Sequence, residues 1–491
     1  MRCFFSVLLS IWLNSCLFIS PCLAADAGSV ARQPLSSKPQ STAKGLLIVA
    51  PQRFEALLQP YVSHKQKQLP TRIESLERVL ENTPGVDDPE RLKRFLFDQW
   101  KERNIGYVLL VGDADILPVR YMVLDRVTAA AFDYAFYPSD LYYSDIAKAD
   151  GNFDDWNAHK EDFHSGYFGE VRGEKNKKDP INFDQIDYRP DIAVGRWPVS
   201  TADEVRLIAE KTMRYENGLP RRDDAQRAAF IGVGGWVDTR PLLDRLAASL
   251  PVGWGVEKRY YADAQRNDKT LPPDTTQVHS LLNKGVGLLY HTGHGTDTEW
   301  EQCFSLTGLD KLRNADRLPI LFSAGCSTAR FATLPPYEAY VDREGKEHKG
   351  TNVGEVFTNP PPPPAPYQKG SFNPPGLGEQ LLRGGPNGAV AYIGCNTGSQ
   401  PCGLTLMEGF VKAFQALDAT REEPKAGPNG GPRLGDCWSQ AVSYYYDSER
   451  LSQLAPNEDW YPASIFFQGM KFMLFGDPTL LMPPRPMPAN K

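Results

Sequence analysis

Two histidines stand three residues apart in a glycine-rich stretch, where their side chains could take part in chemistry. The stretch reads YHTGHGTDTEW over residues 290–300 and contains His291 and His294, two of the seven histidines in the chain. It follows the apolar run VGLL, which predicts a buried strand that ends in a loop. Three uses of such a pair are open: a metal site, a catalytic base, or a histidine that only packs.

A cysteine ends the next apolar run along the chain and offers a partner for one of these histidines. Cys326 closes the run LPILFSAGC, 32 residues after His294. In sheets of parallel strands, ligands bind beyond the carboxyl ends of the strands. If these two strands are neighbours, the Cys326 thiolate can attack a carbonyl while the His294 imidazole handles the proton. The adjacent glycines leave amide N–H groups free to stabilise an oxyanion.

Other roles for the same residues stay open. A metal site would combine His291 and His294 with a cysteine, although His291 lies on a segment that is still extended, so the two imidazoles need not converge. The cysteines also lack the tight CxxC spacing of many metal sites. A structural role is the third option, because a lone cysteine at a strand end often serves as a small buried apolar residue.

The elements that must position these residues alternate between short apolar runs and amphipathic helices. This alternation predicts an α/β fold with a mainly parallel sheet that is covered by helices on both faces. The predicted strands lie at residues 45–50, 107–118, 190–198, 228–235, 286–295, 317–326 and 388–395, and the predicted helices at 53–68, 87–104, 201–218, 241–250, 275–285, 404–417 and 434–453.

Two of the predicted helices carry clear start signals. In one, Asp88 is placed to cap the N-terminus and Pro89 suits the first turn. In the other, Thr201 and Glu204 have the spacing of a capping box, in which each side chain bonds to the backbone of the other residue. These signals fix the beginnings of both helices.

The N-terminal region has the composition of a targeting segment. Residues 1–24 are apolar, carry Arg2 as their only charge and end in small residues up to Ala24, which predicts a secretory signal peptide. A membrane anchor is the alternative. Residues 25–44 are polar and predict a flexible linker. We expect an exported protein, periplasmic or secreted, without stable membrane insertion after cleavage of the signal.

The remainder of the chain predicts two α/β subdomains. The first spans residues 45–225 and the second, which carries both chemical motifs, spans residues 226–485. Residues 128–189 are rich in Asp, Tyr, Asn and Gly and predict a long irregular excursion. Residues 335–376 predict a loop insertion whose NPPPPPAP run cannot supply the donors of a helix or a strand ladder, so we expect polyproline geometry on the surface.

Composition narrows the classes of partner. The net charge of -6 argues against a nucleic-acid footprint, and 41% hydrophobic residues is an ordinary globular value. Five of the eight cysteines lie beyond the predicted signal, and an odd number in an exported protein leaves at least one thiol free or paired between chains. Cys395 and Cys402 are close enough in sequence for a local disulfide.

Together these motifs resemble the gingipain-type cysteine peptidases, which belong to the larger group with the caspase-like fold. That group is similar in having His-Gly after one strand and a small residue followed by Cys after the next. The segments YVLLVGDADILPVR, RPDIAVGRWPVSTADEV and FMLFGDPTLLM also resemble the family, so the likeness covers roughly residues 45–483. It implies a cysteine endopeptidase that acts on proteins or peptides and requires no cofactor.

The resemblance implies roles for individual residues. His294 would be the catalytic histidine and Cys326 the nucleophile, with an oxyanion hole formed by the backbone amides of Gly295 and Cys326. His291 matches no catalytic position and is expected to pack or to support the site. Trp300 matches a family tryptophan that would wall the site, with core packing as the alternative.

The third catalytic residue and the substrate preference are left open. The acidic residue that accompanies the family's histidine would fall near residues 232–238, where this chain has glycines and then Asp238. Asp238 could form the floor of a pocket that selects Arg or Lys, but Arg240 and Arg330 could neutralise it. An acidic substrate side chain read by an arginine, or a small or polar one, is the alternative. Loops that could line the pocket are 236–241, 326–331 and 395–403.

One acidic stretch of the chain could bind calcium, and two other functions compete with the peptidase interpretation. Family members bind calcium, and the stretch DLYYSDIAKADGNFDD at residues 140–155 offers oxygen ligands, although it lacks EF-hand spacing and could be a solvated loop. One rival function is a catalytically inactive binding protein that uses the same groove. The other is a metal-dependent hydrolase.

Overall fold

The structure is a computed structural model, and the residues that it describes lie within one compact unit, Thr42–Lys491. The predicted signal peptide and almost all of the predicted linker, residues 1–42, lie outside the described residues, as does most of the predicted excursion at 128–189. None of the helices that are described is both long and apolar enough to cross a bilayer. The structure describes residues 43–123, 136–156, 186–219, 222–263, 271–358, 361–368, 375–419, 431–453 and 468–483.

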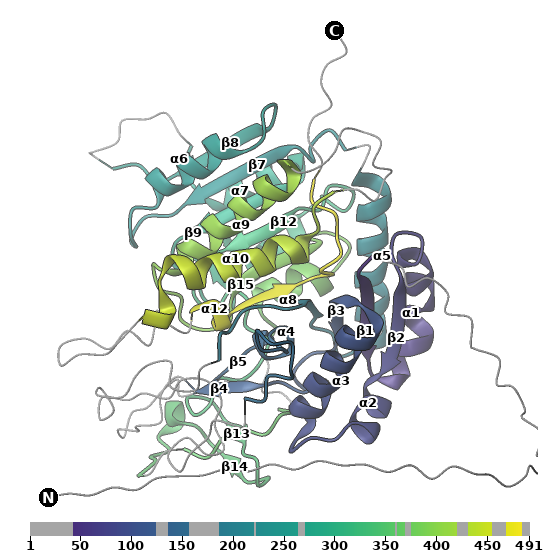
Figure 1. Ribbon diagram of the computed structural model, residues 1–491. Coiled ribbons are helices and arrows are strands. Elements are labelled where there is room, and N and C mark those ends of the chain that lie inside the picture. Colours follow the sequence, from purple (N-terminus) through teal and green to yellow (C-terminus); the bar gives the residue numbers. More distant parts are fainter. Residues whose placement is uncertain are drawn as a thin grey trace, which may run out of the picture. The chain divides into compact units, whose positions relative to one another are not determined.

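Ten of the described strands form a single sheet at the centre of the fold (Figure 1). Their chain order and their order in the sheet differ, so helices and loops cross over between them. Across the sheet the strands are β2 (Thr71–Ser75), β1 (Gly45–Ala50), β3 (Ile105–Val111), β6 (Ala193–Trp197), β16 (Phe472–Phe475), β15 (Ala391–Cys395), β12 (Ile320–Ser323), β9 (Leu288–Thr292), β7 (Arg227–Gly232) and β8 (Gly255–Tyr260).

The sheet consists of two parallel blocks that run in opposite directions. Neighbouring strands are parallel within the block β2-β1-β3-β6-β16 and within the block β15-β12-β9-β7-β8. The pairing of β15 with β16 is antiparallel. The predicted mainly parallel α/β fold is therefore confirmed. The carboxyl ends of β15, β12, β9 and β7 meet at one edge of the sheet, and β16 begins at that same edge.

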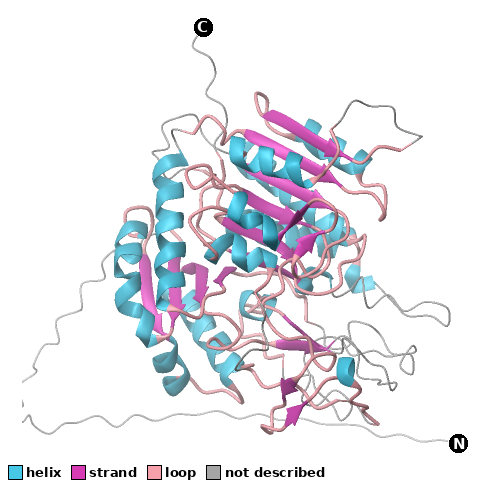
Figure 2. Ribbon diagram, turned by 180° about the vertical axis from the view of Figure 1, so that it is seen from behind, coloured by secondary structure: helices cyan, strands magenta, loops and turns pink. Residues whose placement is uncertain are grey.

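Helices cover both faces of the sheet (Figures 1 and 2). The side chains of the strands alternate between these two faces. In β1, Leu46 and Ile48 face one core while Leu47 and Val49 face the other, as the period of two in a strand requires. The first core is completed by α1 (Gln52–Lys65), α5 (Ala202–Gly218), α7 (Thr275–Lys284) and α8 (Leu377–Arg383), and the second by α3 (Asp88–Arg103), α6 (Arg240–Ser249), α9 (Gly403–Ala419) and α10 (Leu434–Ser448).

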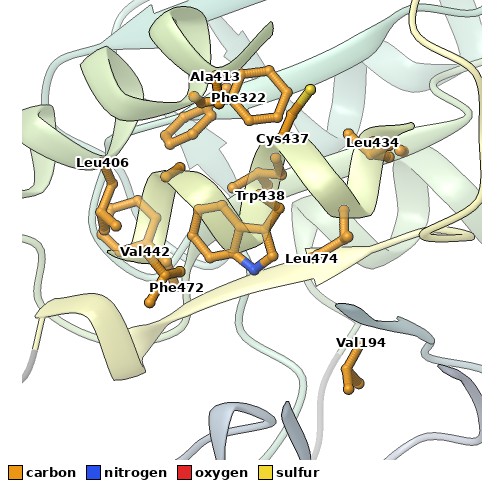
Figure 3. Close-up of a cluster of buried hydrophobic side chains, with 14 of the residues drawn as sticks. Val194, Phe322, Leu406, Ala413, Leu434, Cys437, Trp438, Val442, Phe472 and Leu474 are labelled. Atoms are coloured by element: carbon orange, nitrogen blue, oxygen red, sulfur yellow. The ribbon is translucent and has the colours of Figure 1, made fainter. Parts of the chain in front are cut away.

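Aromatic packing beneath α9 and α10 anchors the strand that leads to Cys326 (Figure 3). Phe322 of β12 is 1% exposed, and its ring centroid lies 5.7 Å from that of Phe410, 6.2 Å from that of Trp438 and 6.1 Å from that of Phe472. Burying one such side chain contributes about 1.5–3 kcal/mol. The end of β12 is therefore held firmly before the chain turns into the site.

Most predicted strands and helices are present, with shifts at their ends. The predicted strand at 107–118 ends at Val111, and the predicted helix at 434–453 ends at Ser448. Three strands of the ten-stranded sheet escaped prediction: β2, β8 and β16. Their sequences TRIES, GVEKRY and FMLF are either rich in charged residues or very short. β2 and β8 lie at the two edges of the sheet, where one side of a strand needs no apolar partner.

The helix caps agree with prediction in one case and correct it in the other. Asp87, not Asp88, caps α3: its carboxylate accepts a hydrogen bond of 3.0 Å from the Glu90 amide, and Asp88 is the first helical residue. The capping box of α5 is confirmed, since Thr201 Oγ1 accepts from the Glu204 amide and Glu204 Oε2 accepts from the Thr201 amide.

The two expected subdomains contribute to one continuous sheet. The join lies between β6 and β16, where Phe475 is in register with Arg196. The proline-rich insertion is tied to the hairpin of β13 (Tyr340–Val341) and β14 (Glu347–His348). Pro363 accepts a hydrogen bond of 3.0 Å from the Arg343 amide, and Ala365 donates one of 2.8 Å to Val341. Within the described residues 361–368 these bonds make an isolated bridge between Asp342 and Pro364 and no strand ladder, in agreement with the expectation. The proline carbonyl accepts and the alanine supplies the donor.

Candidate active site

His294 and Cys326 follow neighbouring strands, and each lies three residues beyond one member of the same pair of opposing residues. β9 and β12 are parallel neighbours, and His291 lies opposite Ser323. His294 follows the first of these residues by three positions, and Cys326 follows the second by three. The expectation that the two strands are adjacent is confirmed. Both residues lie at the sheet edge where four parallel strands end.

Glycines allow the turns after β9 and β12 to touch through their backbones. A Cβ atom on Gly295 would lie 3.0 Å from the carbonyl oxygen of Cys326 and 2.6 Å from Thr328 Cγ2. One on Gly325 would lie 3.3 Å from the Cα atom of Gly295. These distances are shorter than ordinary van der Waals contact, so a larger residue at Gly295 would push the histidine turn away from the cysteine turn.

The imidazole of His294 is oriented by a main-chain carbonyl. Its Nε2 atom lies 2.8 Å from the carbonyl oxygen of Gly235, in the turn that follows β7. A carbonyl oxygen can only accept, so Nε2 carries the hydrogen and donates it. The Nδ1 atom of neutral His294 then keeps its lone pair, which is the state that a proton acceptor requires. The His294 side chain is exposed to solvent.

This carbonyl stands where the sequence left the third catalytic residue open. The acidic partner of the family's histidine would fall near residues 232–238, and in this chain the main-chain carbonyl of Gly235 contacts His294 from that segment. Gly235 has φ +90°, a left-handed conformation that other residues adopt only with strain. The glycines of this segment were the available sequence signal. Every residue has a main-chain carbonyl, so the sequence could not indicate which one contacts His294.

Two backbone amides beside the cysteine are free to bind an oxyanion. Within the described part of the chain, neither the Gly295 amide nor the Cys326 amide donates a hydrogen bond. The hairpin after His294 explains this for Gly295. Thr296 donates to Glu299 and Glu301 donates to His294, which leaves the Gly295 N–H on the outer side of the pair. The geometry is compatible with the expected oxyanion hole.

The sulfur of Cys326 touches a third loop, which follows β15. The Ser399 amide lies 3.3 Å from Cys326 Sγ and donates to it, while the Ser399 carbonyl oxygen accepts from the thiol at 3.6 Å. Cys326 is partly exposed. The loop belongs to the stretch 395–403 that was expected to line the substrate pocket, but the contact of its backbone with the sulfur carried no sequence signal.

His291 and Trp300 form a buried support below the site. His291 is fully buried, its Nδ1 atom lies 2.9 Å from Ser323 Oγ, and burial lowers its pKa to about 3. Its ring stacks on Trp300 with centroids 4.6 Å apart. Trp300 is 0% exposed and donates from Nε1 to the Tyr392 hydroxyl at 2.9 Å. The pocket-wall role expected for Trp300 does not fit, because its hairpin turns the indole into the core.

Asp238 and Arg330, the charged pocket candidates, are both engaged in ion pairs. Arg240 holds both carboxylate oxygens of Asp238, at 2.8 and 3.1 Å, and also binds Asp263 at 2.6 Å. Hydrogen bonds from Arg240 lower the pKa of Asp238. Arg330 pairs with Glu338 and Asp297, so it does not neutralise Asp238. Asp238 is therefore already paired without a substrate.

The other cysteines differ from Cys326 in their surroundings. All five cysteines beyond the predicted signal are free thiols, which corrects the expected bridge between Cys395 and Cys402. Cys395 is fully buried at the end of β15, whereas Cys402 is partly exposed just before α9. Burial raises the pKa of Cys395 to about 12 and that of Cys402 to about 11, and it also raises the pKa of Cys303 and Cys437.

The acidic stretch at 140–155 does not assemble a metal site. Asp140 gives both its oxygens to Arg196, at 2.7 and 2.8 Å. Asp154 accepts from the Trp156 indole, and burial raises the pKa of Asp145 well above its usual range. Among the residues that the structure describes, no three His, Cys, Asp or Glu side chains are grouped closely enough to hold a metal ion. Calcium binding by this stretch stays a prediction.

Comparison with known proteins defines the class. The fold is a caspase-like α/β fold like that of gingipain R, and in this chain His294 and Cys326 follow the neighbouring strands β9 and β12. The chain belongs to peptidase family C25, whose sequence model it matches over residues 39–483. The expected resemblance to gingipains is thereby confirmed.

Individual relatives are distant in sequence. Gingipain R2 of Porphyromonas gingivalis is 21% identical over 328 residues, which are 64% of this chain and 36% of that protein. Lys-gingipain of the same organism is 27% identical over 171 residues, 33% of this chain and 10% of that protein. An uncharacterised protein of Archaeoglobus fulgidus is 22% identical over 381 residues, 73% of each chain. The chain thus spans 36% of the length of gingipain R2.

Solved structures agree with the fold. The crystal structure of the Arg-specific cysteine proteinase gingipain R matches with a TM-score of 0.57 at 16% identity, covering 92% of this chain and 80% of that one. A second structure, described as a protease, matches with a TM-score of 0.54 at 14% identity, covering 89% and 78%. At such identities the likeness concerns the arrangement of helices and strands.

A first prediction concerns the carbonyl that orients His294. Gly235→Ala should reduce kcat about 10- to 100-fold with little change in KM, because the strained backbone moves the acceptor away from Nε2. A Cβ atom at this position would meet only His294 Cδ2, at 3.8 Å, so crowding is not the cause. Gly354→Ala is the matched control, with the same φ of +90° and open space around it. Peptide turnover and the ¹⁵N signals of the His294 tautomer are measured, and full activity with an unchanged tautomer would contradict the role.

A second prediction concerns the pH dependence of stability. A histidine in the unfolded chain titrates near ~6.5, whereas folded His291 titrates at about 3. Between these values the unfolded chain binds a proton that the folded chain does not, so this contribution is complete above about pH 6.5 and declines as the pH falls toward 3. His291→Gln should flatten the slope of the unfolding free energy between pH 6.5 and 4 by up to about 1.4 kcal/mol per pH unit. Urea unfolding at a series of pH values measures it, and an unaltered slope would refute the assignment.

Proposed function

We propose that this family C25 chain is an exported cysteine endopeptidase that hydrolyses peptide bonds with Cys326 as nucleophile and His294 as proton carrier. The observation that carries the proposal is the contact of two turns at the ends of β9 and β12, where Gly235 orients the imidazole and the Gly295 and Cys326 amides donate no hydrogen bond within the described part of the chain. A site that only bound peptides would not need an oriented imidazole beside a thiol.

The first chemical step joins the enzyme to the substrate. The thiolate of Cys326 attacks the carbonyl carbon of the scissile peptide bond, and the carbonyl oxygen becomes an oxyanion. The N–H groups of Gly295 and Cys326 donate to that oxygen. The protonated His294 gives its Nδ1 proton to the leaving nitrogen, the C–N bond breaks, and an acyl thioester on Cys326 remains.

The second step releases the acyl group. A water molecule gives one proton to the Nδ1 atom of His294 and attacks the thioester carbonyl with its oxygen. The C–S bond then breaks, which frees the carboxylic acid product and returns the sulfur as thiolate beside imidazolium. Throughout both steps Nε2 keeps its hydrogen bond to Gly235, so the ring does not turn away while its charge changes.

Export and the class of substrate follow from two further observations. The apolar segment at residues 1–24 has the features of a secretory signal, so the enzyme would act in the periplasm or outside the cell. Membership of a peptidase family supports proteins or peptides as substrates. With a net charge of -6 and no basic stripe in the sequence, nucleic acid is not proposed as a partner.

The nucleophile can be tested by two matched substitutions. Cys326→Ala should abolish peptide cleavage, because loss of a nucleophile costs several orders of magnitude in rate. Cys303→Ala removes a fully buried thiol elsewhere and should leave most of the activity. Turnover of a peptide library by both variants measures this, and substantial cleavage by the Cys326 variant would rule out the assignment.

The same assay separates the rival functions. Inhibition by a thiol alkylator with no effect of a chelator supports the cysteine mechanism. The reverse pattern would indicate a metal-dependent hydrolase. A correctly folded wild type that cleaves nothing in the library, yet binds the peptides, would indicate an inactive binding protein.

The role of Asp238 in substrate selection can be tested directly. Because Arg240 already occupies both of its oxygens, Asp238→Asn should change the ratio of cleavage after Arg to cleavage after Ala less than about threefold. Matched peptides with Arg, Asp or Ala before the scissile bond provide the measurement. A tenfold or larger loss restricted to the Arg peptide would establish Asp238 as the pocket floor.

A further inference from the structure

The loop after β15 reaches the sulfur of Cys326 through its backbone. In the 396–402 loop, only Ser399 bonds to the sulfur: its amide donates at 3.3 Å and its carbonyl accepts from the thiol at 3.6 Å. When the thiol loses its proton, the bond to the carbonyl is lost and the bond from the amide becomes charge-assisted. The orientation of this one amide therefore affects how well a negatively charged sulfur is stabilised.

A buried glutamine holds the residues on both sides of Ser399. Gln468 Oε1 accepts from the Gln400 amide at 3.1 Å, and Gln468 Nε2 donates to the Gly398 carbonyl at 3.4 Å. An amide N–H only donates and a carbonyl only accepts, so these partners fix which end of the glutamine is which. The side chain of Gln468 is 0% exposed, so water does not compete for these bonds.

The glutamine is itself fixed to the sheet. It begins the short helix α12 (Gln468–Lys471), which leads directly into β16. There the first residue, Phe472, is in register with Cys395 at the end of β15. The Asn396 amide also donates to the Lys471 carbonyl at 2.9 Å. The 396–402 loop follows β15 and Gln468 precedes β16, so the two partners in this pair of hydrogen bonds are attached to adjacent strands of one sheet. We call this pair of bonds the clamp.

We infer that Gln468 is a positioning residue for the nucleophile: its side-chain amide holds Gly398 and Gln400 so that the Ser399 N–H stays aimed at the Cys326 sulfur. The inference rests on the proposed role of Cys326. A loop backbone without this clamp can rotate the peptide unit before Ser399, which would turn the donor away and leave the Ser399 carbonyl facing the sulfur. In this proposal Gln468 acts through Ser399 and not by its own contact with the sulfur or the substrate.

Lys471, in the same short helix as Gln468, adds a positive charge near the cysteine sulfurs. It is 4% exposed and makes no ion pair with a carboxylate among the described residues. Burial lowers the pKa of its ammonium group, and the thiols of Cys395, Cys402 and Cys326 act in the opposite direction. A cation in this position favours negative charge on the nearby sulfurs. The short segment before β16 therefore supplies both the clamp and a charge of suitable sign.

The test measures the reactivity of Cys326 without any peptide substrate. Iodoacetamide alkylation of the full chain is followed from pH 5 to 9 and scored at Cys326 by peptide mapping. Gln468→Leu keeps the volume but removes both bonds, and it should slow alkylation at pH 7 about tenfold and move the acid limb of the profile to higher pH. Ser399→Pro removes the donor itself and should have the same effect.

Gln368→Leu is the matched control for loss of a buried glutamine clamp. Gln368 is 2% exposed and bonds to both main-chain groups of Val341 and to the Ala365 carbonyl in the proline-rich insertion, so its loss loosens another loop. It should leave the alkylation profile unchanged. If Gln468→Leu alkylates at the wild-type rate with the wild-type pH profile while its thermal unfolding shows a folded chain, the inference is wrong.

The failure of this inference and the failure of the proposed function give different results. If both loop variants, Gln468→Leu and Ser399→Pro, slow the alkylation of Cys326 but the wild type cleaves no peptide, the endopeptidase proposal is wrong and the positioning role of Gln468 stands. A wild type that cleaves peptides through Cys326, with Gln468→Leu unchanged in both cleavage and alkylation, would do the opposite.

Discussion

The parallel pairing of β12 with its neighbours β9 and β15 is the constraint on which the site depends. Because these strands share one direction, the turns that follow them leave the sheet at one edge and at matching heights. A shift of one residue in the register between β9 and β12 would separate His294 from Cys326 and exchange the faces of the side chains below them. The aromatic core under Phe322 and the stack of His291 on Trp300 hold this register from opposite faces of the sheet.

Main-chain groups make or offer most of the hydrogen bonds at this edge of the sheet. A carbonyl orients the imidazole, two amides stand free beside the cysteine, and a fourth backbone group donates to the sulfur. Ionisable side chains nearby are already paired with one another, as Asp238 is with Arg240. Backbone dipoles do not titrate, so such a site depends on the conformation of its loops. This explains why glycines are concentrated in the turns and why a buried amide side chain is used as a clamp.

The sequence predicted the fold class, most of the strands and helices, and the adjacency of the two motifs, because these follow from apolar periodicity and from the rule that parallel strands end together. It failed for the edge strands β2 and β8, whose charged residues hide the pattern, and for the cap at Asp87. The site was predictable as far as its side chains, His294 and Cys326. The contributions of Gly235 and Ser399 could not be predicted, since a backbone group is present at every residue and only tertiary structure selects one. Trp300 matched a motif, but no pattern tells which way a hairpin turns its indole.

The place of β16 also sets an order of events during synthesis. Every other strand of the described sheet precedes β16 along the chain, yet β16 lies between β6 and β15. A polypeptide that emerges amino end first can pair β1 with β3, or β9 with β12, well before the strand that joins the two blocks exists. Gln468 arrives with that strand. A growing chain would thus contain His294 and Cys326 before Gln468 can position the Ser399 amide against the sulfur. The full reactivity of Cys326 would then develop only after β16 has paired with β6 and β15.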